Sequence, residues 1–89
     1  MVKSNREGGY GRSDIFVKPV RRDIPAYVLE FKIADSIPDL IPKAQEAIAQ
    51  IEDKKYAQEL YDDGYIQVHK YGISFFKKNC HVTFANDID

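Results

Sequence analysis

Alternating apolar and polar positions predict two strands in the first part of the chain. In residues 13–17, Ile15 and Val17 share one face of the predicted strand. Residues 24–33 follow a charged loop and carry apolar side chains on both faces, as a strand in the middle of a sheet does. Because only a short loop separates the two strands, we expect them to pair as an antiparallel hairpin. Three glycines within residues 8–11 predict a turn between these strands and an earlier one.

The middle of the chain predicts a helix that is broken once. Residues 35–39 contain Ser and Asp, which cap helix N-termini, and Pro42 is tolerated only in a first turn. The helix should therefore begin close to Asp39. Apolar residues then recur at helical spacing until the charged stretch at 53–55, where the pattern pauses. A second helical stretch at 56–62 precedes Gly64, a residue suited to the left-handed conformation that ends helices.

The last third of the chain predicts a second hairpin. Its first strand is expected at 65–76, its turn at 77–79 and its second strand at 80–84, with a frayed tail beyond. Gly72 predicts a bulge or a bend in the first of these strands. The resulting order is β-β-α-β-β, an α/β (α+β) domain with a mixed sheet and a central broken helix.

Composition narrows the class of protein without identifying its function. The chain has 89 residues, enough for one domain spanning 1–89 and near the size where a single core becomes marginal. A net charge of −1 provides no basic field for nucleic acid, which counts mildly against DNA binding but does not exclude it. The single cysteine, Cys80, allows no internal disulfide and indicates a reducing, cytoplasmic setting. No apolar run is long enough to span a membrane.

Three charged residues on the first two strands form the candidate site. Glu30 and Lys32 are two positions apart, so they share one face of an otherwise apolar strand, about 6–7 Å apart. Hairpin pairing would bring Asp14 beside Glu30. Two neighbouring carboxylates repel each other, and a divalent cation such as Mg²⁺ relieves that repulsion. A lysine on the same face can then orient or deprotonate an attacking water.

Spacing alone favours a simpler interpretation. A carboxylate two residues from a lysine is a short and common pattern, and a buried ion pair with no catalytic role explains it. Other motifs in the sequence are therefore needed to distinguish a catalytic Glu-x-Lys pair from a structural one.

Several motifs in order resemble a known family. They are Asn-Arg-Glu-Gly-Gly-Tyr-Gly-Arg-Ser-Asp at 5–14, Glu30-Phe31-Lys32, Gln-Ile-x-x-Lys-x-Tyr at 50–56 and Lys-Tyr-Gly-Ile-Ser-Phe at 70–75. Together they resemble the PD-(D/E)XK nuclease-like domain at the C-terminus of a group of bacterial AAA-ATPase-linked proteins. The resemblance covers residues 4 to about 84, nearly the whole chain.

The resemblance implies a restriction-endonuclease-like core that acts on nucleic acid, with DNA as the expected substrate. It implies that Asp14 and Glu30 bind Mg²⁺ or Mn²⁺, and that both act in catalysis with Lys32 and Gln50. Tyr56 matches the motif without a defined role, so packing and a weak nucleic-acid contact both remain open. Two arginines near the N-terminus are further candidates for phosphate contacts: Arg6 and Arg12.

The chain also departs from the resembled family. The superfamily core begins with a helix and a first strand, whereas this chain starts at or inside that strand and lacks the helix. We therefore expect a truncated or excised domain, and a homodimer that covers the exposed sheet face. An AAA-type ATPase region is expected only in full-length relatives. Two functions follow: a metal-dependent nuclease, or an inactive remnant of the fold that serves as a protein- or nucleic-acid-interaction module.

Overall fold

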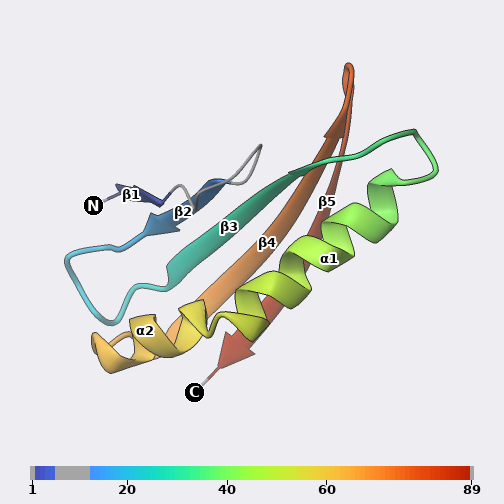
Figure 1. Cartoon of the computed structure of the whole chain (residues 1–89). Helices are drawn as coiled ribbons and strands as arrows, with labels where there is room; N and C mark the ends of the chain where they lie inside the picture. Colours follow the sequence, from blue (N-terminus) through green and yellow to red (C-terminus); the bar gives the residue numbers. More distant parts are fainter. Residues whose placement is uncertain (1, 6–12, 89) are drawn as a thin grey trace.

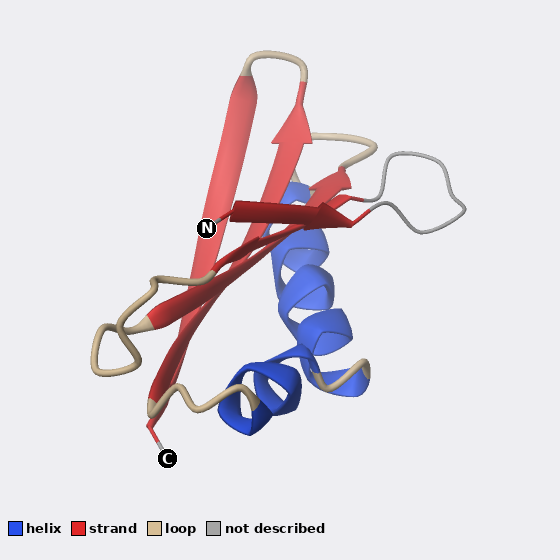
Figure 2. Cartoon of the chain, turned by 90° about the vertical axis from the view of Figure 1, so that its left-hand side faces the viewer, coloured by secondary structure: helices blue, strands red, loops and turns tan. Residues whose placement is uncertain are grey.

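The computed structural model of the protein, described for residues 2–5 and 13–88, is one mixed sheet with two helices on one side (Figures 1 and 2). The sheet has five strands in sequence order: β1 (Val2–Asn5), β2 (Ser13–Val17), β3 (Ala26–Ile33), β4 (Gln67–Phe76) and β5 (Asn79–Ile88). Helices α1 (Leu40–Asp53) and α2 (Tyr56–Asp62) connect β3 to β4. These two strands are parallel, and the other neighbouring pairs are antiparallel. The predicted fold class is confirmed, and β1 is the strand expected before the glycine-rich segment. The glycine-rich turn predicted at residues 8–11 lies outside the described residues.

Strand β3 lies at the centre of the sheet, as its apolar character on both faces predicts. It pairs with β2 on one side as an antiparallel hairpin and with β4 on the other. The β2–β3 register places Asp14 opposite Glu30. The β3–β4 register places Gly72 on the other side of Glu30. Glu30 therefore occupies the centre of the sheet, between Asp14 on β2 and Gly72 on β4.

The helix break falls at the charged stretch that the sequence marks. Helix α1 ends at Asp53, and Lys55 takes the left-handed conformation with φ 58°, so the chain changes direction before α2 begins. Gly64, with φ 105°, ends α2 as predicted. Helix α1 begins directly after Asp39, as predicted, but the Asp39 side chain makes no capping hydrogen bond. The Asp39 backbone is already helical, and its carboxylate accepts the N–H of Asp35 instead.

The hydrophobic core lies between the two helices and one face of the sheet. Its members come from β2, β3 and β4, from both helices and from the connection between α2 and β4: Phe16, Ala26, Val28, Ile51, Tyr56, Ala57, Leu60, Tyr65 and Val68. The apolar positions of α1 that recur at helical spacing, Ala44, Ala47 and Ile51, all face the sheet and are buried. Packing against this face fixes which side chains of α1 meet the central strand.

Gly72 allows α1 to lie directly on the sheet. A Cβ atom at this position would lie 2.2 Å from the backbone oxygen of Ala44, closer than any real contact. Gly72 pairs regularly with Glu30 and with Thr83 on its two sides, so the bulge predicted there is wrong. The glycine serves close helix packing rather than a bend in the strand.

The predicted frayed tail is also wrong for most of its length. Strand β5 continues to Ile88, which pairs with Gln67 at the beginning of β4. The strand extends this far because β4 offers backbone partners along ten residues.

The opposite face of the sheet is apolar and aromatic. Tyr27 and Tyr71 stack with ring centroids 6.3 Å apart, Tyr71 contacts Phe84, and Phe31 stacks on Phe75. Both helices lie on the other side, so within residues 2–5 and 13–88 no helix covers this face (Figure 2). The predicted homodimer, for which this face offers a surface, stays a prediction. Neither described helix is long and apolar enough to cross a membrane.

We predict that Gly72→Ala lowers the free energy of unfolding by about 1–3 kcal/mol, because the added methyl group forces α1 away from the sheet. Urea unfolding followed by circular dichroism measures the change. Val82→Ile is the matched control, since it adds one carbon atom at an exposed position on the open face. An unchanged unfolding midpoint in Gly72→Ala would contradict the close packing of α1.

Candidate functional site

Asp14 and Glu30 lie side by side on the helix-covered face of the sheet. They are paired in register on β2 and β3, and directly opposed residues have Cβ atoms about 4.5–5.5 Å apart. Asp14 is 1% exposed and Glu30 is 0% exposed. Two carboxylates at this depth require donors or cations around them, because burial of an uncompensated charge is costly.

Tyr56, the first residue of α2, supplies one donor to Asp14. Its hydroxyl donates a hydrogen bond to Asp14 Oδ2 at 2.7 Å. The tyrosine ring packs edge-on against Phe16, with centroids 5.1 Å apart, which fixes the direction of the hydroxyl. The other oxygen, Asp14 Oδ1, is buried and has no hydrogen-bond donor among the described residues. This carboxylate therefore keeps one oxygen available for a further positive group.

Gln50 bridges the two charged residues of β3 from α1. In the amide orientation that satisfies both partners, its nitrogen donates to Glu30 Oε2 at 3.0 Å and its oxygen accepts from Lys32 Nζ at 3.1 Å. Lys32 Nζ also lies 3.3 Å from Glu46 Oε1, and the Lys32 side chain is only 11% exposed. One helix face thus fixes both the carboxylate and the ammonium group.

The structure brings together five residues named from the sequence, and it adds Glu46 to them. The five are Asp14, Glu30, Lys32, Gln50 and Tyr56. Glu46 was missed, although it lies one helical turn before Gln50 and therefore shares its face. The four-residue spacing from Gln50 is the sequence signal that could have identified Glu46. Tyr56 was named without a role, and the structure places its hydroxyl on Asp14. Arg6 and Arg12 lie outside the described residues, so their phosphate contacts stay predictions.

The comparison with known families agrees with this geometry. A family model described as the PD-(D/E)XK nuclease superfamily matches residues 1–85. The chain belongs to this superfamily. No curated protein and no solved structure matched the chain significantly. The roles that the sequence resemblance assigns to Asp14, Glu30 and Lys32 stay predictions.

The site of this PD-(D/E)XK domain suits a hard divalent cation better than zinc. Within the described residues, no group of three or more His, Cys, Asp or Glu side chains converges. Zinc sites normally need at least three such ligands, whereas Mg²⁺ is held by one or two carboxylates with waters and substrate oxygens. The Asp14 and Glu30 pair, with the buried Asp14 Oδ1, fits the second description.

We predict that Tyr56→Phe lowers the free energy of unfolding by about 1–3 kcal/mol, because the buried Asp14 carboxylate loses its donor while the ring packing remains. Urea unfolding without metal measures the loss. Tyr71→Phe, on the uncovered face, removes the same hydroxyl as a control and should leave the midpoint nearly unchanged. Equal stability of wild type and Tyr56→Phe would argue against the contact with Asp14.

Proposed function

We propose that the chain is a Mg²⁺- or Mn²⁺-dependent nuclease domain that hydrolyses phosphodiester bonds of DNA. The observation that carries the proposal is the in-register pairing of Asp14 with Glu30, with Lys32 on the same face. Membership of the PD-(D/E)XK superfamily supports it. Residues 1–89 act as a single domain in this proposal, and linkage to an AAA-type ATPase and a bacterial source remain implications of the resemblance.

In this proposal, Asp14 and Glu30 are the metal ligands. A divalent cation bound there would neutralise charge on the scissile phosphate and acidify a bound water. Tyr56 holds Asp14 through Oδ2, and the buried Oδ1, which has no hydrogen-bond donor among the described residues, would bind the metal. Gln50 holds Glu30 through Oε2 in the same way. Both carboxylates are therefore oriented before any ligand arrives, which lowers the cost of assembling the site.

Lys32 is the proposed partner of the attacking water. Its ammonium group is confined between the Gln50 amide oxygen and the Glu46 carboxylate. Confinement by two acceptors fixes Nζ on the face that carries Glu30, where it can donate to the water and stabilise charge that develops on the phosphate. Glu46 is a positioning residue in this scheme, since it touches Lys32 rather than the substrate.

We predict that the purified protein nicks supercoiled plasmid in the presence of Mg²⁺ or Mn²⁺. Asp14→Ala should abolish nicking because it removes a metal ligand. Lys32→Ala should slow nicking by about 10²- to 10⁴-fold, the usual contribution of a positioned acid–base group. Gel electrophoresis of timed samples measures both effects.

Two exposed residues provide matched controls for the nicking assay. Asp23→Ala removes a carboxylate that pairs with Arg21 in the β2–β3 loop, and Lys78→Ala removes a lysine from the β4–β5 turn. Both variants should nick at the wild-type rate. Identical rates in wild type, Asp14→Ala and Lys32→Ala would reject the catalytic assignment.

A second candidate function is a nuclease-fold module that binds a protein or nucleic acid without cutting. The uncovered aromatic face and the net charge of −1 favour it. Metal affinity distinguishes the nuclease from the binding module, because only the nuclease requires a functional cation site.

We predict that Mn²⁺ binds with micromolar affinity and stabilises the protein by about 2.7 kcal/mol at a concentration of 100 times Kd. Calorimetric titration and thermal unfolding measure the two effects. Glu30→Gln should remove both, since it eliminates one of the two metal ligands, whereas Glu59→Gln on the exposed side of α2 should keep both. Failure of Mn²⁺ to bind the wild type would favour the non-catalytic module.

A further inference from the structure

Strand β5 forms one outer edge of the sheet, and its outer side is open to pairing. Within the described residues β5 pairs with β4 alone, since it is last in the strand order (Figure 1). It is ten residues long, and its register with β4 continues along the whole strand without a bulge. The opposite edge strand, β1, has only four residues. Natural proteins protect exposed edges by shortness, bulges, charges or proline, and β5 has neither of the first two.

The residues of the β5 edge lack the other two protections as well. Residues 79–86 contain no Lys, Arg, Asp, Glu or Pro. Phe84 contacts Tyr71 on the uncovered face of the sheet, and the two-residue spacing places Val82 on the same face. Their exposed fractions are 51% and 50%. Cross-strand apolar pairs stabilise neighbouring strands, so this edge gains from a further strand beside it.

The backbone groups on the outer side of β5 belong to alternate residues. Residues 77–78 form a two-residue turn between β4 and β5, and such a turn is closed by a pair that exchanges backbone hydrogen bonds, here Phe76 and Asn79. From Asn79 onward, every second residue therefore directs its N–H and C=O toward β4. The residues between them, which include Val82 and Phe84, direct theirs to the outer side.

We propose that β5 pairs antiparallel with β5 of a second copy of this chain, so that one sheet continues through a symmetric dimer. Directly opposed residues of an antiparallel pair share a face, so the two-fold axis passes beside a residue rather than between two. An axis beside Val82 or Thr83 opposes residues 79–85 or 80–86 to themselves, and neither segment contains a charged residue. A second copy therefore fits without any complementary charge, through the self-complementary type of contact that is commonest in oligomers. The inference is independent of the proposed nuclease activity.

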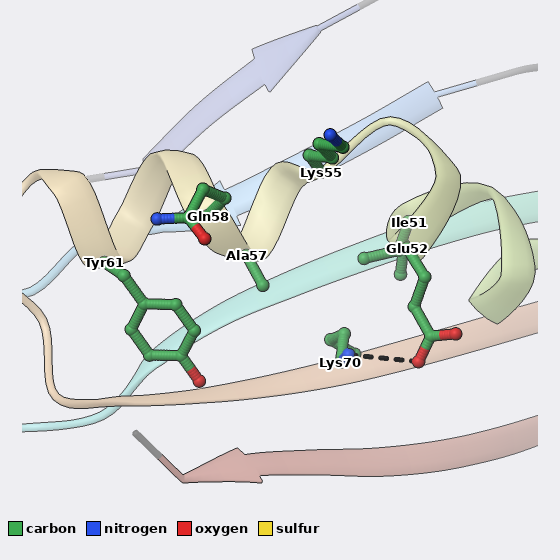
Figure 3. Close-up of a pocket in the computed structure, with 7 residues that line it drawn as sticks. All are labelled: Ile51, Glu52, Lys55, Ala57, Gln58, Tyr61 and Lys70. Atoms are coloured by element: carbon green, nitrogen blue, oxygen red, sulfur yellow. Dashed lines mark hydrogen bonds and ion pairs between the residues drawn. The ribbon is translucent and has the colours of Figure 1, made fainter.

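The helices leave room for this pairing. Helix α1 lies over β4, where the Ala44 backbone lies directly above Gly72 and Glu52 reaches Lys70 at 3.1 Å (Figure 3). In the dimer, three strand spacings separate β4 from the β4 of the second copy, a distance of about 14 Å. Packed helices lie about 8–10 Å apart, so both copies of α1 fit on one side of the continuous sheet.

Sedimentation equilibrium of the purified protein tests the proposal. We expect the mass to rise with concentration from the 10.2 kDa of one chain to twice that value, with a dissociation constant in the micromolar range. A wild type that is still monomeric at roughly 300 µM would overturn the proposal.

Val82→Pro changes the outer side of β5 alone. Proline at this position removes an N–H that faces outward and keeps the pairing with β4, so the dissociation constant should rise at least about tenfold. Val82→Lys should weaken the dimer as well, because it brings like charges together near the axis, and it keeps the test valid if Val82→Pro fails to fold. Val20→Lys, at an 87% exposed position in the β2–β3 loop, is the matched control and should dimerise like the wild type.

Ile33→Lys distinguishes pairing at the edge from contact through the uncovered face. Ile33 is 64% exposed, and its spacing from Phe31, which stacks on Phe75, places it on that face. It belongs to β3, two strands away from the β5 edge. Pairing through β5 predicts wild-type dimerisation of this variant. Loss of the dimer in Ile33→Lys would overturn the proposal, and so would unchanged dimerisation in Val82→Lys or in folded Val82→Pro.

Discussion

Two buried carboxylates on adjacent strands need hydrogen-bond donors around them, and the surrounding helices supply these donors. Asp14 and Glu30 repel each other, and neither faces water. Each is held by a neutral donor from a different helix, Tyr56 from α2 and Gln50 from α1. Neither of these two donors carries a positive charge, so neither of them cancels the negative charge of a carboxylate. The break between the helices allows this arrangement, because α1 can place a donor beside β3 while α2 places one beside β2.

The close approach of α1 to the sheet is what brings Gln50 within reach of Glu30. Gly72 is the neighbour of Glu30 on β4, and it lacks the side chain that would hold the helix away. The Gln50 side chain has a fixed reach. If α1 were displaced by the thickness of a methyl group, the Gln50 amide would lose its contacts with both Glu30 and Lys32. A packing residue on a strand that carries none of the proposed catalytic residues therefore controls the geometry of the site.

Most of the fold follows from local patterns in the sequence, and the exceptions have a common physical cause. Period-two alternation, helical spacing and Gly64 located the strands, the helices and their ends, because these signals act over a few residues. The role of Gly72 depends on which helix packs above it, and the Asp39 side chain depends on the path of the preceding loop. Such facts arise from tertiary contacts and leave no local pattern.

The candidate site was partly predictable for a similar reason. The hairpin between β2 and β3 follows from a short loop, so the pairing of Asp14 with Glu30 could be anticipated. Gln50 and Tyr56 were identified only through the resemblance, since their spacing from the strands spans the whole crossover. Glu46 was accessible from helical spacing once Gln50 was assigned to the site.

The parallel pairing of β3 with β4 has a consequence for the order in which the chain folds. The β2–β3 hairpin is local and can form early, but it places two carboxylates together before their donors are present. Helix α1 has no complete surface to pack on until β4 joins the sheet, and β4 is separated from β3 by both helices. Contacts across such a separation form slowly because the intervening loop must first be closed. We therefore expect the charged pair to be buried only in a late step of folding, when β4 and both helices assemble on the hairpin.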